Sequence, residues 1–191
     1  ASDASSVGTA RSDITGAGYG YDKAIMIFGY NGSSKVNTTN LVNNLGVVAA
    51  DVSTAAGAKS NGDSTTYGTD KAIVAYGINS GGNFTSVSNL ISNAGVTSSD
   101  VTGAGTARRR PAASTYGTDK AIFAFGGRNS DHTNVKNLVS NTGVVASDAT
   151  GVGTSRAAGA GLNYGGDKGI MAYGTTGSGT FTAVSNLISN S

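Results

Sequence analysis

Several residue types are rare or missing in this chain of 191 residues. It has no cysteine and no tryptophan, its acidic residues are all aspartate, and proline and histidine occur once each. The lack of cysteine excludes a disulfide framework and thiolate metal sites. A catalytic triad or a histidine-based metal site would depend on His132 alone, and no GxSxG nucleophile motif is present. We therefore predict no catalytic residues, no cofactor and no metal, and we expect a protein that is not an enzyme.

Charge and long apolar runs are also scarce. Charged residues make up 13% of the chain and the net charge is +2, which favours neither a disordered polyelectrolyte nor a broad nucleic-acid-binding surface. No stretch approaches the 18 consecutive apolar residues expected of a membrane-spanning helix, so we predict no membrane insertion. Glycine is abundant instead, with 30 residues, together with serine, threonine and asparagine. This composition is poor in helix formers and rich in turn residues, and it predicts an all-β fold.

The sequence repeats one pattern four times. An Asp-Lys pair recurs at intervals of 48 or 49 residues, with a tyrosine three residues before it and an Asn-Leu pair after it. The aspartates are Asp22, Asp70, Asp119 and Asp167, and the tyrosines are Tyr19, Tyr67, Tyr116 and Tyr164. A period near fifty residues is typical of repeat architectures, in which each unit needs its neighbours to bury it. Residues 1–191 are therefore predicted to form a single repeat domain, with units centred on the four aspartates.

Four short strands are predicted in each unit. In the third unit they are residues 111–116, 120–125, 133–139 and 144–149, separated by turns rich in glycine or asparagine. The second strand is the most apolar, and its counterparts are residues 23–28, 71–76 and 168–173. Alternate residues point to opposite faces of a strand, and in these segments both sets are apolar. We therefore expect the second strands to be buried on both sides.

Four units of four strands predict a β-propeller, whose blades are sheets stacked face to face around an axis. A β-sandwich would show half-polar strands, and a parallel β-solenoid is usually built from shorter repeats. Residues 1–11 match residues 146–156, which lie late in a unit, and the C-terminal residues match an earlier part. We therefore expect a four-bladed β-propeller whose termini share one blade. The other interpretation of the same pattern is a section of a longer tandem array.

Two resemblances follow from these repeats. An apolar strand that runs into Phe125-Gly126-Gly127 resembles the start of a kelch-type propeller blade, although the later tryptophan of that motif is missing. The segments GTAR, YGTDKAIFAFG and NLVSNTGVVASD resemble glycine-rich repeats of bacteriophage structural and fibre proteins, notably marine ones. This resemblance covers almost the whole chain. It implies a virion component or an extracellular binding module, and it transfers no site residues.

Two sets of residues are candidates for partner binding. Arg108, Arg109 and Arg110 form the main cluster of like charge, beside the single proline, and they interrupt the repeat. They could bind an anionic partner or form a solvated turn. The four repeated tyrosines could form a ring of platforms on which sugars stack, or could fill gaps between blades.

Two repeated charge patterns have structural interpretations. In each Asp-Lys pair, we expect the Asp to accept backbone hydrogen bonds in the turn and the Lys to keep its ammonium group in water. A second set of aspartates could pair with basic residues to link neighbouring strands or blades. These aspartates are Asp3, Asp51, Asp100 and Asp148, and the basic residues are Arg11, Lys59, Arg108 and Arg156.

The sequence therefore predicts a non-enzymatic structural or adhesive component of a virion or an extracellular assembly. Exposed hairpin loops would make its contacts, because rigid sheets can present variable loops at little entropic cost. The expected partners are other structural subunits, copies of the same chain, or a cell-surface glycan, while nucleic acid is disfavoured. The alternative is a secreted multivalent carbohydrate-binding propeller with one site per blade, in the manner of a lectin.

Overall fold

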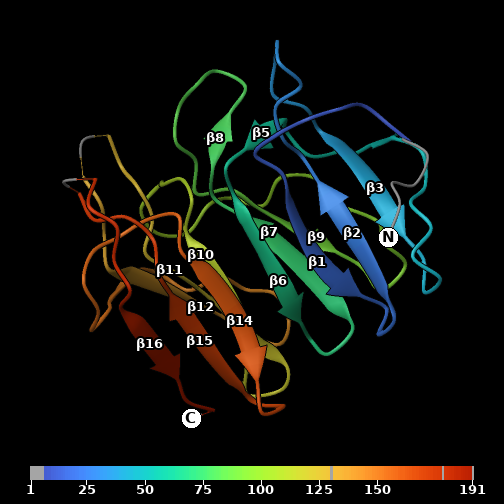
Figure 1. Cartoon of the computed structure of the whole chain (residues 1–191). Coiled ribbons are helices and arrows are strands. Elements are labelled where there is room, and N and C mark those ends of the chain that lie inside the picture. The colour runs from blue at the N-terminus through green and yellow to red at the C-terminus, as the bar shows by residue number, and fades with distance from the viewer. Residues whose placement is uncertain (1–6, 130, 178, 191) are drawn as a thin grey trace.

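The chain consists of β-strands and connecting turns in the part that the computed structural model describes, residues 7–129, 131–177 and 179–190 (Figure 1). These residues contain no helix, and the predicted all-β class is confirmed. Each repeat unit contributes one main antiparallel sheet, which we number in chain order. The predicted Asp3 and most of the N-terminal segment lie outside the described residues.

Each of the four main sheets is built from the strands of one repeat unit. The first sheet contains β1 (Thr15–Tyr19), β2 (Lys23–Ile27), β3 (Thr38–Val42) and β4 (Val52–Ser53). The second contains β6 (Asp63–Tyr67), β7 (Lys71–Ala75) and β9 (Ser88–Ile91), beside a small pair of β5 (Lys59–Ser60) and β8 (Ile78–Asn79). The third contains β10 (Ala112–Tyr116), β11 (Lys120–Ala124), β12 (Val135–Val139) and β13 (Ala149–Thr150). The fourth contains β14 (Ala160–Tyr164), β15 (Lys168–Ala172) and β16 (Ser185–Ile188).

The sheets are stacked in a row through their first strands. β1 packs against β6, β6 against β10, and β10 against β14, so the row follows the order of the chain. Figure 1 shows the first sheet at one end of this row and the fourth sheet at the other. The four first strands together line a cavity of about 290 Å³. The repeated sequence thus produces a repeated stacking, with one junction between each pair of consecutive sheets.

The core lies in the junctions. We call the face of a sheet that meets the following sheet its leading face, and the opposite face its trailing face. At the first junction, Ile25 and Ile27 from the leading face of β2 pack with Ala72 and Val74 from the trailing face of β7. The other two junctions hold equivalent clusters around Phe123 and Met171.

Burial on both faces is confirmed for the second strands of the two inner sheets, β7 and β11. The end sheets are buried on one face only. In β2 the trailing-face residues Ala24 and Met26 are half-buried, and in β15 the leading-face residues Ile170 and Ala172 are half-buried. Within the described residues, no packing comparable to the three junctions joins β1 to β14, and no closed ring is detected.

The predicted strand positions hold, but several strands are shorter than predicted. The second strands stop one residue early, because the aromatic residue that follows has a positive φ, for example 66° at Tyr76. The third strand of the third unit begins at Val135, two residues later than predicted. The predicted fourth strand at residues 144–149 is mostly irregular, with an isolated bridge at Val145 before β13 begins at Ala149.

Candidate functional site at the junctions and hairpin tips

A buried basic residue occupies each junction. In the second junction the guanidinium carbon of Arg108 lies 3.7 Å from the centre of the Tyr76 ring, which belongs to the preceding sheet. The Nη2 atom of Arg108 donates to Oδ1 of Asn137 on its own sheet, at 2.7 Å. The Nδ2 atom of Asn137 then donates to Asp148 at 3.0 Å. A cation is therefore held between an aromatic ring and an amide that is itself bound to a carboxylate.

The same arrangement recurs along the row. Lys59 lies over the Phe28 ring, with its Nζ atom 4.8 Å from the ring centre, and Arg156 lies over Phe125 at 3.6 Å. Asn89 accepts from Lys59 and donates to Asp100, as Asn137 does for its partners. Arg11 donates to Asn40 and approaches Asp51 at 3.6 Å. In the fourth unit, Oδ1 of Asn186 is buried without a hydrogen-bond partner.

Burial and hydrogen bonding shift the ionisation of these groups. Burial lowers the pKa of Lys59 to about 8, although the charge of Asp100 opposes the shift. Burial also lowers the pKa of Arg108. Burial would raise the pKa of Asp148, but hydrogen bonds from Thr106 and Asn137 outweigh it, and the pKa is lowered. The clusters thus connect a buried cation to an exposed carboxylate through an asparagine side chain.

The predicted pairing of aspartates with basic residues is therefore largely indirect. Among the described residues, Arg11 and Asp51 form the one direct ion pair of this set. In the second and third units an asparagine side chain lies between the two charges. The asparagine of the repeated Asn-Leu pair is this residue, and the sequence pattern alone predicted no role for it. The signal that could have identified this role is an asparagine that recurs at a nearly constant separation along the sequence from both charged residues.

The Asp-Lys pairs have a structural role at the other end of the sheets. Asp70 accepts from Lys71 at 3.0 Å and from the side-chain amide of Asn93, also at 3.0 Å. The predicted exposure of the lysine is observed, since the side chain of Lys71 is 42% exposed. The carboxylate differs from the prediction because it binds an asparagine side chain in the turn that follows the third strand of its sheet. Asp22, Asp119 and Asp167 make the same bond with Asn44, Asn141 and Asn190.

The four repeated tyrosines do not form an exposed ring. Tyr19, Tyr67 and Tyr116 are buried, whereas Tyr164 on the fourth sheet is 41% exposed. Tyr19 and Tyr67 pack against a turn glycine of the following unit. The first three tyrosines thus occupy junctions and offer no platform to a sugar. Tyr164 lacks this cover because it lies on the leading face of the last sheet.

The three consecutive arginines are separated by the fold. Arg108 is fully buried, Arg109 is half-buried, and Arg110 is exposed. Nε of Arg110 donates to Asn61 at 2.6 Å, and its Nη2 atom lies 3.5 Å from a carboxylate oxygen of Asp13. Arg110 therefore connects three units.

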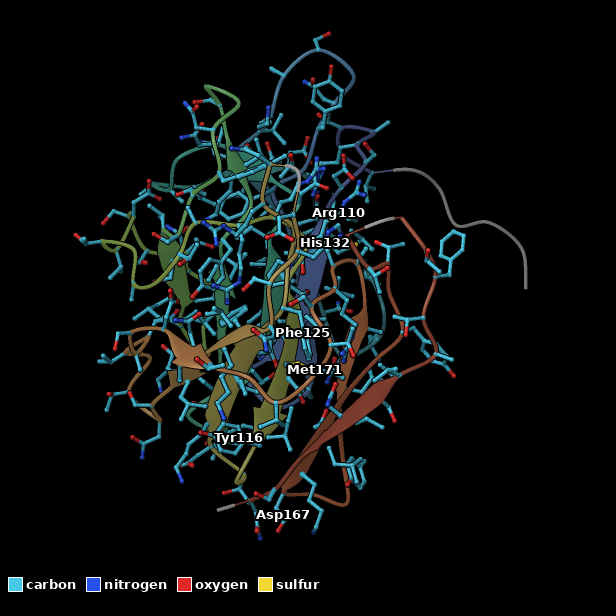
Figure 2. The ribbon with its side chains drawn as sticks, turned by 90° about the vertical axis from the view of Figure 1, so that its left-hand side faces the viewer. Arg110, Tyr116, Phe125, His132, Asp167 and Met171 are labelled. Atoms are coloured by element: carbon cyan, nitrogen blue, oxygen red, sulfur yellow. The ribbon has the colours of Figure 1, made fainter. Side chains whose placement is uncertain are left out.

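A basic pocket remains at the tips of the third and fourth units. It has a volume of about 380 Å³, and its walls include Arg109, Arg110, Arg128 and His132. Figure 2 shows Arg110 and His132 close together at the end of the molecule opposite to Asp167. The Nδ1 atom of His132 is buried without a hydrogen-bond partner. The pocket thus combines several cationic donors with one unsatisfied ring nitrogen, and it suits an anionic group.

A second, more apolar cavity of about 220 Å³ lies at the third junction. Tyr116, Phe125 and Met171 line it, and Figure 2 shows these three side chains near one another. Residues of the third sheet, such as Ile122, and of the fourth sheet, such as Ile188, complete its walls. The cavity therefore lies between these two sheets.

Known proteins assign no function to these residues. No protein-family model matches the chain, and no curated protein matches it significantly. Across residues 7–129, 131–177 and 179–190, no cluster of His, Asp or Glu side chains could hold a metal ion. The same residues contain no helix able to cross a membrane.

Proposed function

We propose that the chain is a non-enzymatic structural or adhesive component of a virion or another extracellular assembly. The observation that carries this proposal is a contrast between two sets of charges. The repeated basic residues, such as Arg108 and Arg156, are buried in the junctions, where they support the stack. The charges that belong to one unit only, such as Arg128, lie at a solvent-exposed tip beside an open pocket. The repeat thus serves the scaffold, and the tips are available for recognition.

The scaffold itself is proposed to be a propeller-type array in which each sheet is one blade. Two features support this interpretation: the four first strands line one cavity, and β7 and β11 are buried on both faces. Closure of the four blades into a ring, with both termini in one blade, stays a prediction. The resemblance to phage repeats remains the basis for the proposed location in a virion.

The proposed partner carries carboxylate or sulfate groups, as an acidic cell-surface polysaccharide does. Arg109 and Arg128 supply forked donors that match such groups, and His132 has a free ring nitrogen in the same pocket. Asp13 offsets the charge of Arg110, and Asp131 lies beside His132, so Arg109 and Arg128 supply the remaining positive charge. The pocket volume of about 380 Å³ suits one acidic sugar residue rather than a large apolar ligand.

Calorimetric titration with polygalacturonate tests this proposal, with uncharged dextran as the reference polymer. We expect binding to polygalacturonate only, with affinity that falls as salt increases. The substitution Arg128→Ala should weaken binding by about tenfold or more, because a hydrogen bond to a charged group contributes roughly 1.5–3 kcal/mol. Lys35→Ala, which removes one positive charge from the tip of the first unit, is the matched control and should have little effect. Equal binding of both polymers, or equal losses in both variants, would contradict the proposed site.

A further inference from the structure

Main-chain hydrogen bonds connect consecutive units in the same way at all three junctions. The glycine that follows the junction aromatic donates its amide to the carbonyl of the next unit's basic residue. These bonds join Gly29 to Lys59 at 3.0 Å, Gly77 to Arg108 at 2.8 Å, and Gly126 to Arg156 at 2.8 Å. Because side chains take no part, this bond is available to any pair of units in the same orientation.

Two further main-chain bonds recur with the same regularity. The first runs from a turn glycine to the carbonyl of the next unit's Asp: Gly20 to Asp70, Gly68 to Asp119 and Gly117 to Asp167, each at 2.7 Å. The second runs in the opposite direction, from Asn61 to Asp13 at 3.1 Å, Arg110 to Asn61 at 2.7 Å, and Ala158 to Arg110 at 3.1 Å. Every junction therefore uses the same three bonds.

The first and fourth sheets each carry donors and acceptors of these three bonds that have no main-chain partner among the described residues. On the fourth sheet, the amides of Gly165 and Gly174 and the carbonyl of Ala158 have no main-chain partner among the described residues. On the first sheet, the same holds for the carbonyls of Arg11 and Asp22 and for the amide of Asp13. Each free donor at one end thus has a free acceptor at the other.

The apolar surfaces at the two ends are also incomplete. On the leading face of the fourth sheet, Leu162, Tyr173 and Leu187 are 66%, 63% and 70% exposed. The counterparts of Tyr173, which are Phe28, Tyr76 and Phe125, are all buried beneath a cation from the next unit. On the trailing face of the first sheet, Met26 is half-buried, while its counterparts Val74 and Phe123 are fully buried.

We propose that the leading face of the fourth sheet binds the trailing face of the first sheet in a second copy of this chain. In this head-to-tail contact Arg11 of the second copy lies over Tyr173, and the three main-chain bonds form between the copies as they do within one. The occupant is a second copy because the chain itself carries both matching faces, one on the fourth sheet and one on the first. Such a heterologous contact produces a closed ring of copies or a filament, depending on the rotation between them.

Sedimentation equilibrium over a wide concentration range tests the proposal on the 191-residue chain. We expect a mass that rises with concentration to at least twice the 18.8 kDa of one chain. Leu162→Asp on the fourth sheet and Met26→Asp on the first should each abolish self-association, because a carboxylate would be buried in the contact. Val144→Asp is the matched control, since Val144 is exposed on an inner unit and lies outside the end faces.

Mixing the two end variants distinguishes head-to-tail from symmetric association. Leu162→Asp keeps an intact first sheet and Met26→Asp keeps an intact fourth sheet, so the mixture should form a dimer and no larger species. Circular dichroism of each variant alone checks that it is folded. A chain that stays at 18.8 kDa at every concentration, or folded variants that do not combine, would overturn the proposal. A monomer in which the Gly165 and Gly174 amides resist hydrogen exchange would show closure within one chain instead.

Discussion

Arg108 and Tyr76 lie 3.7 Å apart, from guanidinium carbon to ring centre, although they belong to different sheets. The arginine is fully buried, and it also donates to Asn137 on its own sheet. The Arg108 side chain thus contacts both sheets, although its Nε atom is buried without a hydrogen-bond partner. A buried cation of this kind affects the free energy of unfolding mainly because its removal leaves its hydrogen-bond partners unpaired.

Removal of the Arg108 side chain should destabilise the fold severely. Arg108→Ala leaves Oδ1 of Asn137 without its donor and opens a void beside Tyr76, so we expect a loss of about 3 kcal/mol in the free energy of unfolding. Urea denaturation measures this loss. Arg128→Ala, at an exposed tip, should change stability by less than about 0.5 kcal/mol. Similar midpoints for the two variants would show that the junction cation has no structural role.

The asparagines of the junction clusters should differ in importance between units. Asn137→Leu removes an acceptor for Arg108 and a donor to Asp148, and it should cost about 2–3 kcal/mol. Asn186→Leu should be close to neutral, because Oδ1 of Asn186 already lacks a partner. The comparison of their urea midpoints checks whether the amide acts as a link between charges. A large loss for Asn186→Leu would contradict that role.

Lys59 should make stability increase with pH in the alkaline range. Burial lowers its pKa from 10.5 to about 8. Below about pH 8 the folded and unfolded chains both carry the charged lysine, so the folded chain bears the full cost of burying it. Between about pH 8 and 10.5 the folded chain binds fewer protons than the unfolded chain, and stability therefore rises with pH. The gain should reach up to about 3 kcal/mol in urea denaturation, and Lys59→Met should remove it while Lys35→Met does not.

Asp63 should produce the opposite trend at acidic pH. Burial raises its pKa from 3.8 to about 6, although hydrogen bonds from Ser64 and Thr15 limit the shift. Between about pH 4 and 6 the folded chain binds more protons than the unfolded chain, so stability falls as pH rises. We expect a loss of about 1–2 kcal/mol over this range. Asp63→Asn should flatten the profile.

The strands could be predicted from the sequence because a strand depends mainly on the local alternation of its apolar residues and on the turns beside it. Alternating apolar residues between glycine-rich turns located β7 and β11, and the apolar residues on both faces correctly indicated double burial. The strand ends were less predictable. Tyr76 and Phe125 adopt positive φ values of 66° and 62°, which bulky side chains rarely do. The exposed Tyr173 has the same conformation, with a φ of 63°, so the strand end is a property of each unit that the apolar pattern does not reveal.

The candidate site was predictable only in part, because it depends on contacts between units. The arginine cluster appeared as one patch in the sequence, but the fold buries Arg108 and directs Arg110 towards Asn61. The contribution of Arg128 and His132 to the same pocket could not be inferred, since it depends on how one tip folds over the next unit. Likewise, the repeated tyrosines could be assigned to the junctions only once the stacking direction was known.

The three inter-unit bonds have a consequence for how such a chain can change over generations. Since they join peptide groups, a whole unit can be duplicated, exchanged or deleted without redesigning the surfaces on either side. The loops at the tips are then free to diversify one at a time, each on a framework already fixed by its neighbours. A gene of this type can therefore vary its tip loops by recombination between its own copies, with folding preserved at each step.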